Sequence, residues 1–152
     1  MLDFWLGREA CGQILVLCEP NDGQREIMSM LTAFEHRCLF VDRLSEAYEI
    51  LEQEQIELII SAVHLEKSDT YEFLTRVKTS NQWKEIPFVF LCLPGTKVAR
   101  HINHTLKMAA KALGASKYLS LENHNIAWVQ EEIASCLPHH QVLTHEKVPM
   151  AT

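Results

Sequence analysis

Five short apolar runs, separated by segments with helical periodicity, most strongly limit what this 152-residue sequence can fold into. The third run, Leu58-Ile59-Ile60, contains no polar position, and this pattern is typical of a strand buried on both faces of a parallel sheet. The other predicted strands are 14–17, 38–41, 88–93 and 118–121. Because these strands alternate with helices and short loops, we predict an α/β fold with one doubly wound, five-stranded parallel sheet that has helices on both faces.

The segments between the runs carry apolar residues at helical spacing and polar side chains that can begin a helix. The candidate N-caps are Asp22, Asp42 or Ser45, Asp69, and Asn123 or Asn125. Asp69 is followed three residues later by Glu72, a pairing typical of a capping box. The predicted apolar faces of the first, fourth and last helices are Ile27, Met28, Leu31 and Phe34; Val98, Ile102, Leu106, Ala109 and Leu113; and Ile126, Val129, Ile133 and Leu137. Gly114 is expected to end the 97–113 helix and Pro138 the last one.

The sequence predicts one domain over residues 13–138, with an N-terminal arm (1–12) and a flexible C-terminal tail (139–152). A chain of this length buries roughly 70% of its unfolded surface, so it folds without a metal or disulfide. No apolar run approaches the ~20 residues that cross a bilayer. The first thirteen residues also lack the basic start of a signal peptide. We therefore expect a cytoplasmic protein that does not engage a membrane.

Charge and cysteine usage argue against several functions. The net charge of -6 disfavours nucleic acid as the main partner. The five cysteines are an odd number without CxxC spacing, so neither a disulfide framework nor a zinc site is expected. His101 and His104 are neighbours on a helical face, but zinc needs a third ligand that the sequence does not supply.

Four segments, in their order along the chain, resemble the receiver domain of response regulators in two-component (phosphorelay) signal transduction. They are 14–17 followed by Glu19, 58–65, 86–91 and 113–119. The resemblance covers about residues 13–137, nearly the whole chain. It implies a flavodoxin-like sheet with strand order 2-1-3-4-5 and a role in bacterial signalling.

Receiver domains take a phosphoryl group onto an aspartate with the help of Mg²⁺, a lysine, and a threonine or serine. This chain departs from that pattern at nearly every matching position. The matching residues are Ala62 for the aspartate, Cys18 and Glu19 for the acidic pair, Cys92 for the threonine or serine, Leu121 for the lysine, and Tyr118 for the switch aromatic. Only Glu19 and Tyr118 keep the family's residue type.

These replacements remove the chemistry of phosphoryl acceptance. Ala62 offers no carboxylate nucleophile, and one carboxylate beside a soft thiol holds Mg²⁺ poorly. We therefore expect no enzyme, no cofactor, weak or absent Mg²⁺ binding, and a pseudo-receiver that works as a phosphorylation-independent protein-interaction module. Two alternatives stay open: residual phosphotransfer to another aspartate or glutamate, and small-molecule sensing in a hollow made apolar by Cys92, Ala62 and Leu121.

Five of the fourteen Lys and Arg residues fall between residues 93 and 121, a stretch without an acid. On the predicted helix the basic side chains share an arc of about 120°. They are Lys97, Arg100, His101, His104, Lys107 and Lys111. This face is either a plain solvated surface or a docking site for a signalling protein with an acidic surface, such as a sensor kinase or an output domain. The resemblance favours docking, because receivers bind partners through the fourth helix, fifth strand and fifth helix.

Two apolar features add to the predicted surface. Trp128 projects away from the apolar face of the last helix and is a candidate interface anchor, unless the arm or the tail covers it. The N-terminal arm contains Leu2, Phe4, Trp5 and Leu6, more apolar residues than a linker requires. Two roles are open for the arm: it covers the domain, or it forms a contact in a homodimer.

Overall fold

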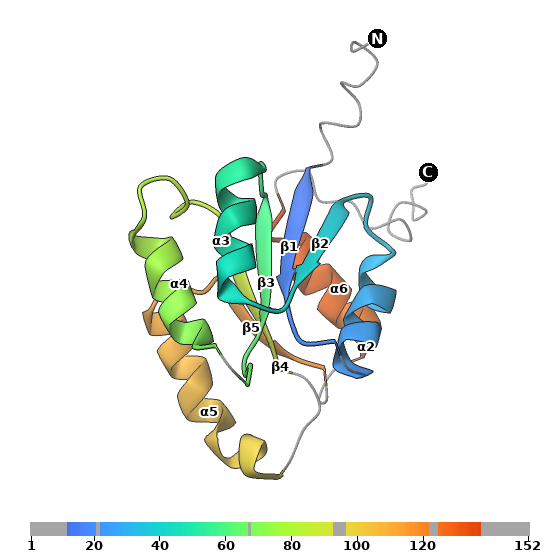
Figure 1. Cartoon of the computed structure of the whole chain (residues 1–152). Helices are drawn as coiled ribbons and strands as arrows, with labels where there is room; N and C mark the ends of the chain where they lie inside the picture. The colour runs from blue at the N-terminus through green and yellow to red at the C-terminus, as the bar shows by residue number, and fades with distance from the viewer. Residues whose placement is uncertain (1–11, 21, 67, 93–96, 122–124, 138–152) are drawn as a thin grey trace.

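The computed structural model describes residues 12–20, 22–66, 68–92, 97–121 and 125–137, which form one parallel sheet between two layers of helices (Figure 1). The strands are β1 Gln13–Leu17, β2 Arg37–Val41, β3 Leu58–Ala62, β4 Phe88–Cys92 and β5 Lys117–Ser120. Their order is β2-β1-β3-β4-β5, and every neighbouring pair is parallel. The predicted fold class and strand order are therefore confirmed.

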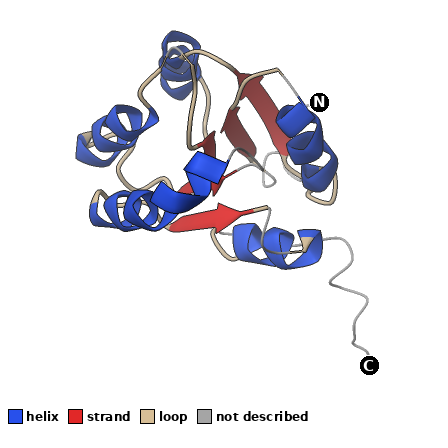
Figure 2. Ribbon diagram, turned by 90° about the horizontal axis from the view of Figure 1, so that it is seen from below, coloured by secondary structure: helices blue, strands red, loops and turns tan. Residues whose placement is uncertain are grey.

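The helices cover both faces of this sheet, as Figure 2 shows. They are α2 Asp22–Leu31, α3 Leu44–Gln53, α4 Thr70–Thr79, α5 Lys97–Ala112 and α6 Ile126–Ala134. Buried residues of α2 and α6 share one hydrophobic cluster, and buried residues of α3, α4 and α5 share the other. Within the described residues no helix is long and apolar enough to cross a membrane.

The alternation of side chains along the strands explains the two clusters. In β1, Ile14 and Val16 face the α2/α6 cluster, whereas Leu15 and Leu17 face the opposite cluster. All five residues of β3 are buried, as expected for the central strand of a parallel sheet.

Two helix caps were predicted correctly. The Asp69 carboxylate accepts hydrogen bonds from the amides of Tyr71 and Glu72, and the Asn125 side chain accepts from the Trp128 amide at 2.7 Å. Such side-chain caps satisfy amides that have no partner inside the helix.

Three expectations about helix ends were wrong. Helix α3 follows Arg43, which makes no side-chain cap, so neither Asp42 nor Ser45 begins it by capping. Asp22 is the first residue of α2 rather than a residue before the helix. The last helix ends at Ala134, where tight turns over residues 133–137 replace the helical pattern before Pro138 is reached.

Three apolar residues that were assigned to buried helix faces are exposed. Met28, Leu113 and Ile126 keep 46%, 39% and 44% of their surface accessible. Leu113 lies just beyond the end of α5, Ile126 is the first residue of α6, and Met28 lines a surface groove. Met30, which was not predicted as a core residue, is buried on α2 instead.

Candidate functional site

The candidate site lies where the carboxyl ends of β1, β3, β4 and β5 meet, the edge at which ligands collect in open α/β sheets. The structure brings Cys18, Ala62 and Leu121 into one apolar cluster, together with the α2/α6 face. Cys92 instead packs against the opposite cluster, which includes Tyr118. Cys18, Ala62 and Leu121 on the one hand and Cys92 on the other therefore pack on opposite faces of the sheet.

Ala62 ends β3 in an apolar environment. It is 5% exposed, and Leu121 is 9% exposed in the same cluster, which also contains Leu91. Its neighbour Ser61 is fully buried and donates its hydroxyl to the Ala62 carbonyl at 2.8 Å. The end of the central strand thus presents a packed hydrocarbon surface.

Glu19, the remaining acid of the site, is used structurally. Its Oε2 accepts a hydrogen bond of 2.7 Å from the backbone amide of Glu66 in the loop after β3. A hydrogen bond to an ionised carboxylate is stronger than a neutral one. The contact therefore ties the β3–α4 loop to the end of β1.

The thiol of Cys18 is protonated and buried. Burial raises its pKa to about 11, and the negative charges of Asp42 and Glu19 act in the same direction, against a hydrogen bond with Gln24 that lowers it. A thiol that holds its proton is a poor nucleophile and a poor metal ligand. Neither Cys18 nor Cys92 forms a disulfide bond among the described residues.

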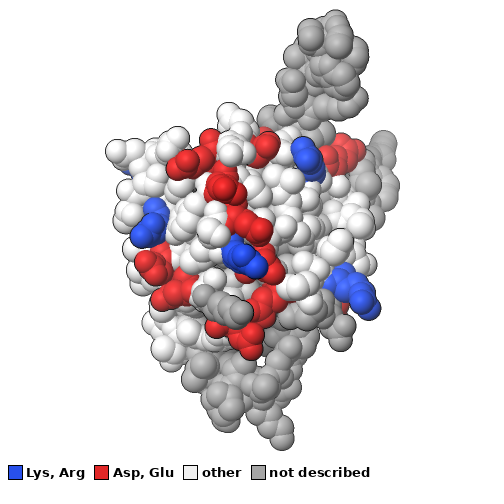
Figure 3. All heavy atoms as spheres, in the orientation of Figure 1, with Lys and Arg blue, Asp and Glu red and all other residues white. Residues whose placement is uncertain are grey.

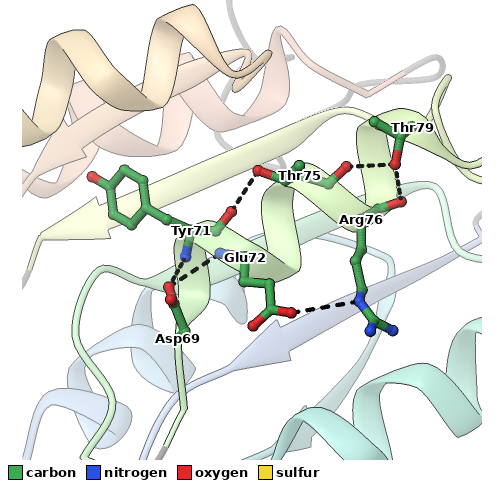
Figure 4. Close-up of polar contacts among 6 residues, drawn as sticks. All are labelled: Asp69, Tyr71, Glu72, Thr75, Arg76 and Thr79. Atoms are coloured by element: carbon green, nitrogen blue, oxygen red, sulfur yellow. Dashed lines mark hydrogen bonds and ion pairs between the residues drawn. The ribbon is translucent and has the colours of Figure 1, made fainter.

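Two residues at the start of α4, which the sequence analysis did not single out, tie this helix to the end of β3 and to α5. The Thr70 hydroxyl donates to the Val63 carbonyl at 2.6 Å, and the Tyr71 hydroxyl donates to the Leu106 carbonyl at 2.8 Å. Figure 4 shows the Tyr71 ring on the opposite side of α4 from the Glu72–Arg76 ion pair. A hollow of about 500 Å³ lies here, and its lining includes His64, Glu66, Tyr71 and Leu106.

The retained aromatic, Tyr118, lies within a chain of rings. It is 7% exposed, its ring centroid lies 6.1 Å from that of Phe90, and Phe90 stacks on Tyr71 at 4.8 Å. Burial raises the pKa of Tyr118, and the nearby Cys92 thiol adds to this shift. In this structure Tyr118 is therefore a buried, neutral side chain.

The predicted partner surface falls on two helices that flank the edge strand β5. His104, Lys107 and Lys111 are exposed on α5. Lys97 and Arg100 also belong to α5, and their side chains, like that of His101, lie outside the described residues. Trp128 is 38% exposed on α6, on the opposite face of the sheet. A surface that uses both must extend across β5.

Acidic side chains gather on a different part of the molecule. Figure 3 shows many of them on the face where α3 lies. Glu46, Glu49 and Glu52 are exposed on that helix. The described surface is thus divided between an acidic α3 and the exposed basic residues of α5.

No family model and no curated protein matches the sequence. Among solved structures, the receiver domain of an HD domain-containing protein from Pseudomonas fluorescens Pf-5 is similar, with a TM-score of 0.68 and 19% identity over 85% of this chain and 88% of that one. The receiver domain of a signal transduction histidine kinase from Syntrophus aciditrophicus has a TM-score of 0.66 and 16% identity over 93% of this chain and 96% of that one. The receiver domain of the sensor histidine kinase PA1611 from Pseudomonas aeruginosa PAO1 has a TM-score of 0.64 and 18% identity over 82% of this chain and 95% of that one. The chain therefore has the fold of a receiver domain.

The Pseudomonas aeruginosa receiver was solved with a magnesium ion coordinated in its active-site cleft. At the same edge of this chain Ala62 has no donor atom, the Cys18 thiol keeps its proton, and one oxygen of Glu19 accepts a backbone amide, so these side chains supply few of the hard oxygen ligands that Mg²⁺ prefers. Within the described part of the chain, no three His, Cys, Asp or Glu side chains come together in a way that could hold a metal ion.

Proposed function

We propose that this protein is a receiver-like response regulator domain of bacterial two-component signalling that acts without phosphorylation, as a cytoplasmic protein-interaction module and not as an enzyme. The observation that carries the proposal is the end of β3, where Ala62 is buried among apolar side chains, while Glu19, the acid predicted for this site, is engaged by the Glu66 amide. Transfer from a phosphodonor needs a free carboxylate nucleophile and a cation to offset the charge. Neither role is filled by these residues.

The phosphorylation half of the proposal is tested by intact-mass measurement after incubation with a small phosphodonor and Mg²⁺. The expected result is an unchanged mass. A stoichiometric gain of one phosphoryl group, located by peptide mapping on an aspartate or glutamate, would instead establish residual phosphotransfer.

The proposed partner is a signalling protein with an acidic surface, a sensor kinase or an output domain, bound by α5 and the β5 edge. Lys107 and Lys111 are exposed on α5, and the exposed Trp128 ring supplies an aromatic anchor at the far side of β5. Basic side chains at the rim of an interface mainly accelerate association and select partners of opposite charge. Lys97, Arg100 and His104 extend the same helix.

The partner surface is tested with a matched pair of charge reversals. The double variant Lys107→Glu and Lys111→Glu should lose a cross-linked partner that wild type retains. The control is Arg43→Glu with Lys84→Glu, which makes the same change in net charge at two other exposed positions. Equal loss in both variants, or in neither, would contradict a docking site on α5.

A further inference from the structure

The most apolar hollow described on this domain lies at the opposite side of the sheet from α5, between α2 and the edge strand β2. Its volume is about 500 Å³, and its lining includes Arg25, Met28, Leu31, Phe34, Cys38 and Phe40. Met28 is 46% exposed, although a large apolar side chain is normally covered when its neighbours are apolar as well. Cys38 and Phe40 belong to β2, which has a partner strand on one side only.

The chain itself leads into this groove. The carbonyl of Gly12, the first described residue, accepts a hydrogen bond of 3.3 Å from the amide of Arg37, the first residue of β2. Arg37 stands between His36 and Cys38, both of which line the groove. The N-terminal arm therefore starts within one hydrogen bond of the groove, whatever its own conformation.

The sequence of the arm is complementary to the groove in hydrophobicity and charge. Leu2, Phe4, Trp5 and Leu6 are apolar, and Asp3 among them can pair with Arg25 at the margin of the groove. Five residues, 7–11, separate this apolar segment from Gly12. Fully extended, five residues reach roughly 17 Å, about the length of the five-residue strand β2 at about 3.3 Å per residue.

A buried polar group at the same end also lacks a partner. The His36 side chain is 3% exposed, and its Nδ1 has no hydrogen-bond partner among the described residues. Its Nε2 lies 3.3 Å from the Glu57 carboxylate, beside Gly12. A buried polar atom without a partner is costly, so a segment that brings backbone amides or carbonyls to this position gains free energy.

We propose that residues 2–6 of the arm fold back onto this groove and cover Met28, Cys38 and Phe40 within the same molecule. The arm then works as an intramolecular cover for the α2 side of the β2 edge. A covered edge strand also protects the domain against pairing with a second chain. This role is independent of the basic surface on α5.

The test uses the full chain labelled with fluorotryptophan, which gives one ¹⁹F resonance for each of the three tryptophans, Trp5, Trp83 and Trp128. The variant Trp5→Phe identifies the Trp5 resonance, because that signal is absent from its spectrum. In the native protein the Trp5 resonance should lie away from its position in urea and should not depend on protein concentration. Met28→Glu should move it more than half of the way to the unfolded position.

Met108→Glu is the matched control, because Met108 is 60% exposed on α5, away from the groove. It should leave the Trp5 resonance unchanged, and the Trp83 and Trp128 resonances report that each variant is folded. A second variant replaces Leu2, Phe4, Trp5 and Leu6 by serine in the full chain; it should shift the amide signals of Cys38 and Phe40. A Trp5 resonance at the unfolded position, or one insensitive to Met28→Glu, would overturn the proposal. A resonance that moves only as protein concentration rises would assign the groove to a second copy instead.

Discussion

The carboxylate of Glu19 accepts the backbone amide of Glu66 at 2.7 Å, across 47 residues of sequence. The contact joins the segment that follows β1 to the loop that follows β3, at the edge of the sheet where a receiver would carry out its chemistry. One oxygen of this carboxylate is therefore engaged in a structural contact that links two loops.

Removing this link should loosen the β3–α4 loop. Glu19→Ala is expected to lower the free energy of unfolding by about 1–2 kcal/mol, since a hydrogen bond to a charged group is lost. Hydrogen exchange at the Glu66 amide should accelerate more than exchange in β1. Glu49→Ala, at an exposed position of α3, is the control and should change neither quantity appreciably. Unchanged exchange at Glu66 in the Glu19 variant would contradict the anchoring role.

Restoring an acid at the end of β3 should destabilise the fold. Ala62→Asp places a carboxyl group among Leu91, Leu119 and Leu121, where burial disfavours the charged form. We expect a loss of about 3 kcal/mol at pH 7 in urea unfolding.

The pH dependence of this loss distinguishes charge from size. Burial raises the pKa of the introduced carboxyl above its unfolded value of about 4, so the penalty grows as pH rises through the folded pKa and shrinks as pH falls toward 4. Ala62→Asn has nearly the same shape and no titratable group, and its loss should not vary with pH. If the stability loss of the two variants had the same pH dependence, a buried charge would not be its cause.

The hydrogen bond between Tyr71 and the Leu106 carbonyl links α4 to α5 at 2.8 Å, and Tyr71→Phe should cost about 1 kcal/mol. Burial, with a smaller effect of Cys92, raises the Tyr71 pKa from 10.0 to about 12. The folded state therefore keeps this proton longer than the unfolded chain, and the contribution is complete below pH 10 and is lost as pH rises to 12. The free energy of unfolding, measured between pH 10 and pH 12, should fall less steeply with pH in the Tyr71→Phe variant than in wild type.

Cysteine labelling should separate buried thiols from accessible ones. Burial raises the Cys18 pKa from 9.0 to about 11, so its thiolate is about a hundredfold less populated near pH 8 than that of an unperturbed cysteine. Iodoacetamide treatment followed by peptide mass spectrometry should modify Cys18 more slowly than the partly exposed Cys136. In urea the two rates should converge. Rapid labelling of Cys18 in the folded protein would show that the end of β1 is open.

Much of the fold could be predicted because its signals are local. The continuous apolar run of 58–60 and its four counterparts predict buried parallel strands, and Asp69 and Asn125 act on amides two or three residues away. The strand order came from the resemblance to receivers and is confirmed by the sheet. Cys18, Ala62 and Leu121 lie at the carboxyl ends of β1, β3 and β5, and they share one edge because parallel strands end together.

The details of the site depended on contacts between distant parts of the chain. The anchoring of Glu19 and the link from Tyr71 to Leu106 span 47 and 35 residues, and neither leaves a pattern in the sequence near the residue concerned. The exposure of Met28 could not be predicted either, because helical spacing identifies an apolar face but not which part of that face other elements cover.

The amino-acid sequence by itself therefore determined the strands, their alternation with helices and the presence of alanine, which has no carboxylate, at position 62. These features follow from side-chain type and spacing along the chain. Only the tertiary structure decided that Glu19 accepts the Glu66 amide, that Cys92 and Ala62 pack in opposite clusters, and that α2 and β2 form an apolar groove. Each of these depends on which surfaces meet when the described helices pack on the two faces of the sheet.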